Sequence, residues 1–211
     1  MIVIINPNST VSMTEAMLVT ARQASPDARI EAWTSHDGPP AIQGPEDGEA
    51  SVPPLLKLVA KASDQGARVI IIGCFDDTGL EEARGVATCP VIGIGQAAYH
   101  LAALAGARFS VVTTLAFSSP ILEQNIKNYG LGGSLSQVRA SGVPVLDLET
   151  SVEASADRVL AEIANAQTQD DIQSVVLGCA GMSHIPARAG SEITVRLIDG
   201  VKAAVQFGAL L

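Results

Sequence analysis

Short runs of almost entirely apolar, mostly β-branched residues recur along the chain, and each ends at a glycine or a polar residue. Such runs are typical of strands buried on both faces, as in parallel sheets. They occupy residues 2–5, 69–72, 91–94, 109–112 and 175–177, and a further strand is expected at 29–33. Alanine-rich stretches of helical period separate them, at about 12–24, 53–65, 79–87, 96–105, 117–128, 152–166 and 199–210. This alternation predicts an α/β fold with doubly wound, Rossmann-like parallel sheets.

The two halves of this 211-residue chain repeat one pattern. Residues 69–74 and 174–179 both read as a buried strand followed by Gly-Cys, at an offset of 105 residues. A second pair of strands ends at Asn6 and Thr113, at an offset of about 107. We therefore expect two pseudo-symmetric lobes with the active site in the cleft between them. The alternative is that any two strands of parallel sheets resemble each other, and the repeated cysteine argues against it.

Residues 34–53 break the regular alternation, because proline and glycine are dense there. This composition predicts a long loop. Loops of that length in a compact domain are usually functional or disordered. Since the segment follows the strand at 29–33, we expect it at the carboxyl edge of a sheet, where ligands bind in α/β folds.

The charge balance narrows the choice of partners. Thirteen basic and twenty-two acidic residues give a net charge of −9, so no basic surface is available for nucleic acid. No apolar run is long enough for a transmembrane helix, and the first residues lack the pattern of a signal peptide. A cytoplasmic protein that does not bind membranes is expected. Only 17% of the residues are charged, which suggests that a homo-oligomer covers part of the surface.

The three cysteines differ in their surroundings. Cys74 and Cys179 each follow the end of a strand, and each precedes an expected helix start, whereas Cys89 precedes Pro90 and is expected to be structural. The positive end of a helix lowers a thiol pKa toward neutrality. No spacing of a zinc site or of a Cys-x-x-Cys pair is present. Two opposed thiols in a reducing compartment are therefore suited to proton transfer on the two faces of a carbon atom held between them.

With these cysteines the chain resembles the Asp/Glu/hydantoin racemase superfamily, and within it the hydantoin racemase and allantoin racemase branch. The resemblance covers nearly the whole chain, in order. Its motifs are the segments 6–10 (NPNST), 73–80 (GCFDDTGL), 111–114 (VVTT) and 177–182 (LGCAGM). Glutamate and aspartate racemases typically carry Asn-Thr after the first cysteine and Thr-His or Thr-Glu after the second. This chain has Phe75-Asp76 and Ala180-Gly181, which argues against a free amino acid as substrate.

The resemblance implies a role for each matching position. Cys74 and Cys179 would be the two acid/base residues of a racemase without a metal ion or organic cofactor. Its substrate would be a small cyclic ureide, either a 5-substituted hydantoin or allantoin. The residues expected to contact the substrate are Asn6, Ile42, Phe75, Asp76, Thr113, Thr114, Ala180 and Gly181. The family's connectivity also places residues 1–95 with 199–211 in the first lobe and residues 96–198 in the second.

Several alternatives stay open at this point. For Asp76, contact with substrate and contact with neighbouring backbone are both possible, and Asp77 is expected to cap the helix that follows it. His184 is expected to lie on the surface or behind the site. The same fold also serves decarboxylases and cis–trans isomerases of small carboxylic acids, and a two-lobed protein can bind a small molecule without any catalysis. A racemase is the main expectation. The presence of both cysteines weighs against a decarboxylase, for which one is sufficient, but it does not exclude a cis–trans isomerase, which uses two.

Overall fold

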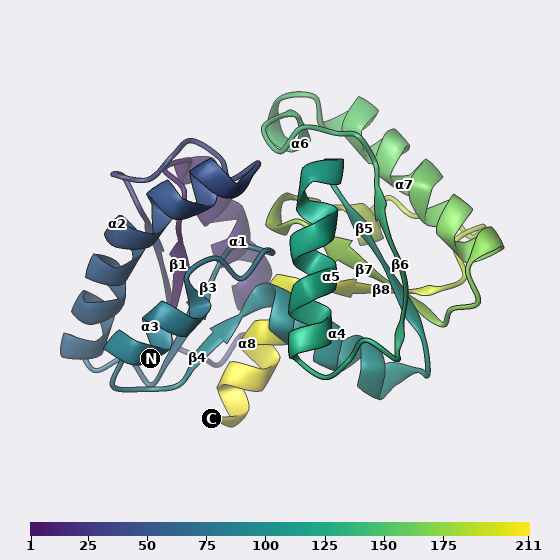
Figure 1. The fold of residues 1–211 in the computed structure, drawn as a ribbon. Coiled ribbons are helices and arrows are strands. Elements are labelled where there is room, and N and C mark those ends of the chain that lie inside the picture. Colours follow the sequence, from purple (N-terminus) through teal and green to yellow (C-terminus); the bar gives the residue numbers. More distant parts are fainter.

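The computed structural model describes residues 1–211 as two α/β lobes, each built on a four-stranded parallel sheet (Figure 1). The first sheet has the order β2-β1-β3-β4 and the second the order β6-β5-β7-β8. The strands are β1 (Ile2–Asn6), β2 (Ile30–Thr34), β3 (Val69–Ile72), β4 (Val91–Gly93), β5 (Phe109–Thr113), β6 (Leu135–Ala140), β7 (Ser174–Gly178) and β8 (Arg196–Asp199). The helices are α1 (Val11–Ala24), α2 (Pro45–Asp64), α3 (Leu80–Val86), α4 (Ile94–Ala105), α5 (Ser119–Asn128), α6 (Asp147–Thr150), α7 (Val152–Gln169) and α8 (Gly200–Leu210).

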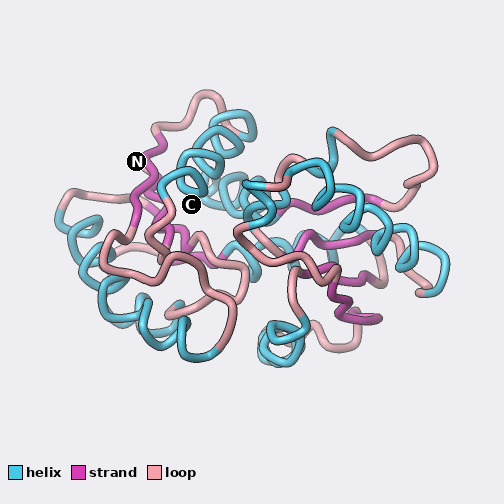
Figure 2. The backbone as a smooth tube through the Cα atoms, turned by 90° about the horizontal axis from the view of Figure 1, so that it is seen from above, coloured by secondary structure: helices cyan, strands magenta, loops and turns pink.

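The two sheets share one topology, which confirms the predicted pseudo-symmetric α/β fold. In each lobe the first strand lies between the second and the third, and all pairings are parallel. The two central strands of each sheet, β1 with β3 and β5 with β7, are buried at every position. Figure 2 shows the lobes side by side from above. The cysteine-bearing strands β3 and β7 therefore occupy equivalent places in the two sheets.

Helices α4 and α8 each follow a strand of one sheet and pack against the other sheet. The chain leaves β4 directly into α4, which packs against β7 and β8 of the second sheet. It leaves β8 directly into α8, where Gly208 lies against Ile2, Val69 and Ile71 of the first sheet. The two helices also pack against each other between the lobes (Figure 1). The assignment of residues 1–95 with 199–211 to one lobe and 96–198 to the other stays a prediction, and this packing is consistent with it.

The prediction of a continuous loop over residues 34–53 is wrong in its second half, because α2 begins at Pro45. Proline is favourable at the first position of a helix, and the acidic residues of the first turn complement the helix dipole. Asp47 also accepts a hydrogen bond from the Gln43 backbone at 3.0 Å. The helix continues through Pro53 and Pro54, whose missing N–H groups would have paired with carbonyls of the exposed residues Glu49 and Ala50. Water is available to those carbonyls.

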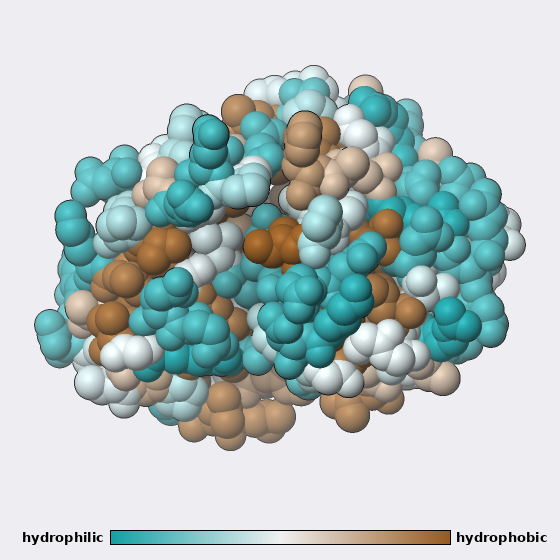
Figure 3. Space-filling view, in the orientation of Figure 1, coloured by the Kyte–Doolittle hydropathy of each residue, from teal (hydrophilic) through white to brown (hydrophobic).

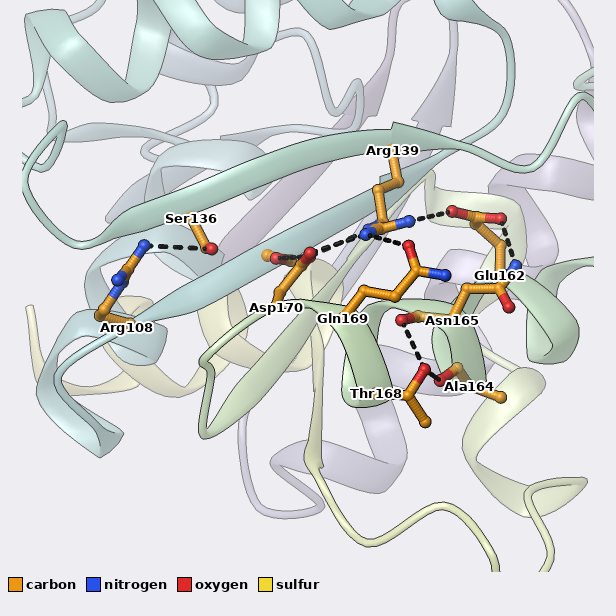
Figure 4. Close-up of polar contacts among 10 residues, drawn as sticks. Arg108, Ser136, Arg139, Glu162, Ala164, Asn165, Thr168, Gln169 and Asp170 are labelled. Atoms are coloured by element: carbon orange, nitrogen blue, oxygen red, sulfur yellow. Dashed lines mark hydrogen bonds and ion pairs between the residues drawn. The ribbon is translucent and has the colours of Figure 1, made fainter.

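Strands β6 and β8 were not predicted, because both are edge strands with polar sequences. An ion-pair network attaches β6 to α7 (Figure 4). The Arg139 guanidinium on β6 donates to both carboxylate oxygens of Asp170, at 2.9 and 2.6 Å, and to Glu162 at 3.0 Å. Its side chain is 11% exposed and that of Asp170 is 5% exposed. Ion pairs therefore hold β6 against α7, and the strand lacks the apolar pattern by which it could have been predicted from the sequence.

None of the helices is both long and apolar enough to cross a membrane. Hydrophobic side chains remain on the surface, and some gather where α8 ends, at the lower edge of the view in Figure 3. Leu210 and Leu211 there are 84% and 58% exposed. The expected homo-oligomer stays a prediction.

Candidate active site

Cys74 and Cys179 follow the carboxyl ends of β3 and β7, and both line one narrow cavity of about 50 Å³. The glycine before each cysteine has a steric reason. A Cβ on Gly73 would lie 2.7 Å from the Met17 sulfur, and a Cβ on Gly178 would lie 2.9 Å from the Thr113 Cα. The repeated Gly-Cys pattern therefore reflects close packing at the two strand ends that present the thiols.

The structure brings all the predicted site residues except Thr113 to this cavity. It also adds residues that the sequence analysis did not identify. The complete lining is Asn6, Asn8, Met13, Met17, Ile42, Gly73, Cys74, Phe75, Asp76, Thr114, Ser118, Val145, Gly178, Cys179, Ala180 and Gly181. Asn8 lies within the Asn-Pro-Asn motif and could have been identified from it. Val145 lies in a segment with no sequence signal, and only the fold brings it here.

Thr113 does not line the cavity, and its position explains why. The side chain is 1% exposed, and its hydroxyl donates to the Gly178 carbonyl at 3.1 Å. Thr113 and Gly178 are also register partners on neighbouring strands. Thr113 therefore binds the last residue of β7, directly before Cys179.

The two asparagines of the first loop differ in their free hydrogen-bonding capacity. The Asn6 amide nitrogen donates to Asn8 at 2.8 Å, to the Thr14 hydroxyl at 3.0 Å and to the Thr10 carbonyl at 3.2 Å. The Asn8 amide nitrogen contacts only the Met13 sulfur, at 3.5 Å. A thioether is a weak acceptor. Asn6 therefore organises the loop, and Asn8 has the amide donor that is better placed for a ligand.

The expected lowering of the thiol pKa values is wrong for the ligand-free protein. Burial raises the pKa of Cys74 to about 12, and the negative carboxyl of Asp76 adds to the rise. Burial likewise raises the pKa of Cys179 to about 11. The helix start predicted near residue 79 is confirmed, since α3 begins at Leu80, but it does not offset burial of the Cys74 thiol, and only a 3₁₀ turn (Ala180–Met182) follows Cys179. Desolvation of the thiolate therefore dominates over any helix dipole.

Each thiol nevertheless accepts an N–H from the residue two positions further along. The Asp76 backbone donates to Cys74, and the Gly181 backbone donates to Cys179, and each contact lowers the pKa of its thiol. The Thr78 hydroxyl lies 3.5 Å from the Cys74 sulfur and has the same effect. The pseudo-symmetry of the fold thus extends to the hydrogen bonds that stabilise a thiolate once it forms.

We expect both cysteines to be alkylated by iodoacetamide more slowly than a free thiol at pH 8, because only the thiolate reacts. The rates should continue to rise well above pH 9, and Asp76→Asn should accelerate both by removing a negative neighbour. Peptide mass spectrometry would assign the label to each cysteine, in a Cys89→Ser background. Rapid labelling of Cys74 or Cys179 at pH 7 would contradict the effect of burial.

Asp76 is the only charged residue that lines this cavity. Burial raises the pKa of its carboxyl to about 6, and contact with the Ser118 side chain limits the rise. No lysine or arginine forms an ion pair with it. Its backbone carbonyl accepts a hydrogen bond from Asn125 at 2.8 Å. Asp76 therefore brings a half-buried, ionisable carboxylate to both thiols without a compensating cation.

Asp77 caps a helix, but not the helix that follows it. Its carboxylate accepts hydrogen bonds from the backbone of Gly95 at 3.0 Å and of Gln96 at 2.7 Å, both in the first turn of α4. The Tyr129 hydroxyl donates to it at 2.8 Å. The residue has a φ of 51°, and a Cβ on Gly93 would lie 1.9 Å from its carboxylate oxygen. Asp77 thus connects the turn that follows Cys74 to the start of α4 and to Tyr129 in the second lobe.

The lobes also contact each other close to Val145, which lines the cavity. The Val145 backbone donates to the Gln43 side chain at 3.1 Å, and the Ser12 hydroxyl donates to Glu149.

Neither His184 nor Cys89 lines the cavity. Burial lowers the pKa of His184, and its buried Nε2 has no hydrogen-bond partner. No group of three or more His, Cys, Asp or Glu side chains is arranged to hold a metal ion.

Comparison with known proteins agrees with this geometry. A family model described as Asp/Glu/Hydantoin racemase matches residues 2–208. A hydantoin racemase from Rhizobium meliloti is 42% identical over 209 residues, which cover 99% of this chain and 87% of that protein. The allantoin racemase structure from Klebsiella pneumoniae has a TM-score of 0.95 at 34% identity, covering 100% of this chain and 86% of that one. The structure of allantoin racemase from Pseudomonas fluorescens has a TM-score of 0.94 at 31% identity, covering 100% and 89%.

These relatives bear out the expected resemblance and the expected enzyme class, an isomerase of the racemase type. The match extends over nearly the whole length of the chain, and it includes both strand ends that carry the cavity cysteines. The chain belongs to the Asp/Glu/hydantoin racemase family.

Proposed function

We propose that this isomerase interconverts the enantiomers of a small cyclic ureide, either allantoin or a 5-substituted hydantoin, using Cys74 and Cys179 as its two acid/base residues. The observation that carries the proposal is that two thiols from equivalent strand ends line the same narrow cavity. Groups of the same chemistry on two opposed faces are what inversion of a single carbon centre needs. The similarity to hydantoin and allantoin racemases supports the choice of substrate class.

In this mechanism one cysteine, as thiolate, removes the C5 proton from one face of the ring. The electron pair moves into the adjacent carbonyl, and the opposite thiol donates a proton to the other face. The enantiomer reacts in the reverse direction with the roles exchanged. The N–H groups that Asp76 and Gly181 direct at the sulfurs stabilise whichever thiolate is present. Backbone N–H groups of Phe75 and Ala180 are our candidates for the carbonyl that becomes an enolate.

The raised thiol pKa values fit a carbon acid as substrate. A buried thiolate is scarce at neutral pH, but it is a stronger base than a solvated one once it forms. The efficiency of a general base depends on the product of the fraction that is deprotonated and the driving force for proton transfer, and a higher pKa increases the second of these. The C5 hydrogen of a hydantoin is a weak acid next to a carbonyl, so a strengthened base suits it. Since one proton must leave the pair of thiols, the rate should rise with pH in the neutral range.

The cavity argues against small carboxylic acids as substrates. No lysine, arginine or histidine lines it, and its one charged residue is the acid Asp76. A carboxylate substrate would therefore meet like charge without a counter-ion. A neutral ureide has no such cost, and its N–H groups match the acceptors that are present.

A chiral assay would test the proposal. Each enantiomer of allantoin, 5-benzylhydantoin and 5-isobutylhydantoin would be followed by circular dichroism, and C5 exchange in D₂O by proton NMR. We expect interconversion well above the spontaneous rate for at least one compound, and no loss of activity after treatment with EDTA. Conversion of maleate or an arylmalonate without racemisation would favour the isomerase or decarboxylase alternative. Binding of the ureides without exchange would favour a non-catalytic module.

The remaining expectations extend the proposal. Independence from cofactors, a cytoplasmic location and a homo-oligomeric state remain part of this proposal, and each needs its own measurement. Analytical ultracentrifugation would determine the oligomeric state.

A further inference from the structure

The narrow cavity between the thiols borders a wider one of about 510 Å³. Three residues line both spaces, and we call the boundary that they form the passage: Ile42, Asp76 and Ser118. The start of α2, the turn at residues 76–79 and residues 117–125 form the wider cavity. A ring held between the thiols would fill the narrow space, so its C5 substituent would extend through this passage.

The charged side chains around this path are all acidic. The wider cavity adds Glu49 and Asp77 to Asp76, and neither cavity is lined by a lysine, arginine or histidine. The Asp77 carboxylate already accepts three hydrogen bonds, and Glu49 is exposed on α2. Asp76 is therefore the carboxylate with unused acceptor capacity at the passage.

The partners of Asp76 leave room for a ligand. A carboxylate offers about four lone-pair sites, and the Ser118 hydroxyl is the one side-chain donor that lowers the pKa of this carboxyl. Burial of an ionised carboxylate without a cation is unfavourable unless donors compensate it. A substituent with N–H groups would supply such donors, whereas an alkyl substituent would displace water and leave the carboxylate without them. The apolar side chains of Val52, Phe117 and Ile121 in the wider cavity suit the hydrocarbon part of such a substituent.

We infer that Asp76 is a specificity residue that selects ureides whose C5 substituent carries N–H donors, with a cationic amino or guanidino group bound most strongly. This inference rests on the proposed racemase function and names the class of substituent that the site prefers. Neutral donors such as a ureido group use the same acceptor, but without the charge attraction. Hydrogen bonds in which the donor or the acceptor is ionised are shorter and about twice as strong as neutral ones, and a cationic donor adds Coulomb attraction to the carboxylate.

The experiment compares two substrates of nearly equal shape. The compounds 5-(4-aminobutyl)hydantoin and 5-pentylhydantoin differ by an ammonium group in place of a methyl group. For the wild-type enzyme we expect the ratio of kcat/KM for the amino compound to that for the pentyl compound to be about 10 to 100. The ratio removes any effect that a change at Asp76 has on the reactivity of the thiols, because that effect is common to both substrates.

Variants then assign the preference to one residue. Asp76→Asn keeps the shape of the side chain and should bring the ratio to within about threefold of one. Asp64→Asn, at the exposed end of α2, makes the same change in net charge away from the cavities and should leave the ratio unchanged. Asp76→Asn should lower kcat/KM less for allantoin than for the amino compound, since the ureido group of allantoin is neutral.

The outcomes separate this inference from the proposed function. If the wild-type enzyme racemises both compounds with a ratio near one, the selectivity inference is wrong and the racemase proposal stands. An unchanged high ratio in Asp76→Asn would assign the preference to another residue and also overturn the inference. If the wild-type enzyme racemises no ureide at all, the proposed function itself fails. The wild-type ratio does not depend on the folding of any variant.

Discussion

Replacing either Cys74 or Cys179 with serine is expected to lower the rate of racemisation by about 10²- to 10⁴-fold. A serine hydroxyl has nearly the shape of the thiol, but it is a far poorer base and acid in this pH range. Each cysteine contributes from one strand end, and no other thiol lines the cavity. Loss of one therefore leaves a single proton-transfer group on one face of the substrate.

The two variants should differ in the enantiomer whose C5 proton they still exchange. The remaining cysteine can remove the C5 proton of one enantiomer and return a deuteron from D₂O to the same face. Cys74→Ser and Cys179→Ser should thus exchange opposite enantiomers without inverting them, as followed by NMR on each pure enantiomer. Cys89→Ser is the matched control, since Cys89 lies outside the cavity, and it should retain wild-type rates. Full racemisation by either single variant would exclude the two-base mechanism.

The largest effect on stability is expected for Arg139→Ala. Removal of this guanidinium leaves Asp170 and Glu162 without their cation, and the Asp170 side chain is only 5% exposed. Loss of one partner from a buried pair typically destabilises a protein by about 3–5 kcal/mol. Urea denaturation followed by circular dichroism would measure the change. Arg29→Ala is the matched control, because Arg29 is 79% exposed beside Glu31, and exposed pairs contribute about 0–1 kcal/mol.

The same network predicts a dependence on pH. Hydrogen bonds from Arg139 lower the pKa of Asp170 below its ordinary value, which is about 3.9 in the unfolded chain. A carboxyl whose pKa is lower in the folded state adds stability that is fully present above the unfolded pKa. This contribution is lost as the pH falls through the folded pKa. The stability difference between wild type and Arg139→Ala should therefore shrink below about pH 4, and an equal difference at pH 7 and pH 3 would argue against the assignment.

Much of the fold could be predicted from the sequence, because it is encoded in local patterns. A run such as Val69–Ile72 is apolar at every position, which suits only a strand covered on both faces. The repeat of Gly-Cys then indicated two equivalent lobes with a thiol at each strand end. Predictions failed where distant contacts replaced local signals. Strand β6 is polar and is attached by Arg139 to α7, and helix α2 begins inside a segment whose prolines and glycines suggested a loop.

The site, like the fold, has features that local sequence encodes and features that depend on distant contacts. Residue types and their order predicted the two cysteines, and the family resemblance predicted seven of the other fourteen residues that line the cavity. The pKa values of the thiols could not be predicted, because desolvation depends on every atom packed around a group and not on the residues beside it in the chain. Asp77 illustrates the same limit, since its backbone partners at Gly95 and Gln96 are 18 and 19 positions away.

The sequence alone therefore determined the strands with continuous apolar runs, where they end and which two residues carry the thiols. These features follow from backbone preference and hydrophobic pattern, which act over a few neighbouring residues. The tertiary structure decided that α4 and α8 exchange lobes and that Thr113 supports β7 instead of facing the cavity. It also left Asp76 as the one charge beside both thiols. Burial and hydrogen bonding between distant segments produce these properties, and they exist only once both lobes have packed together.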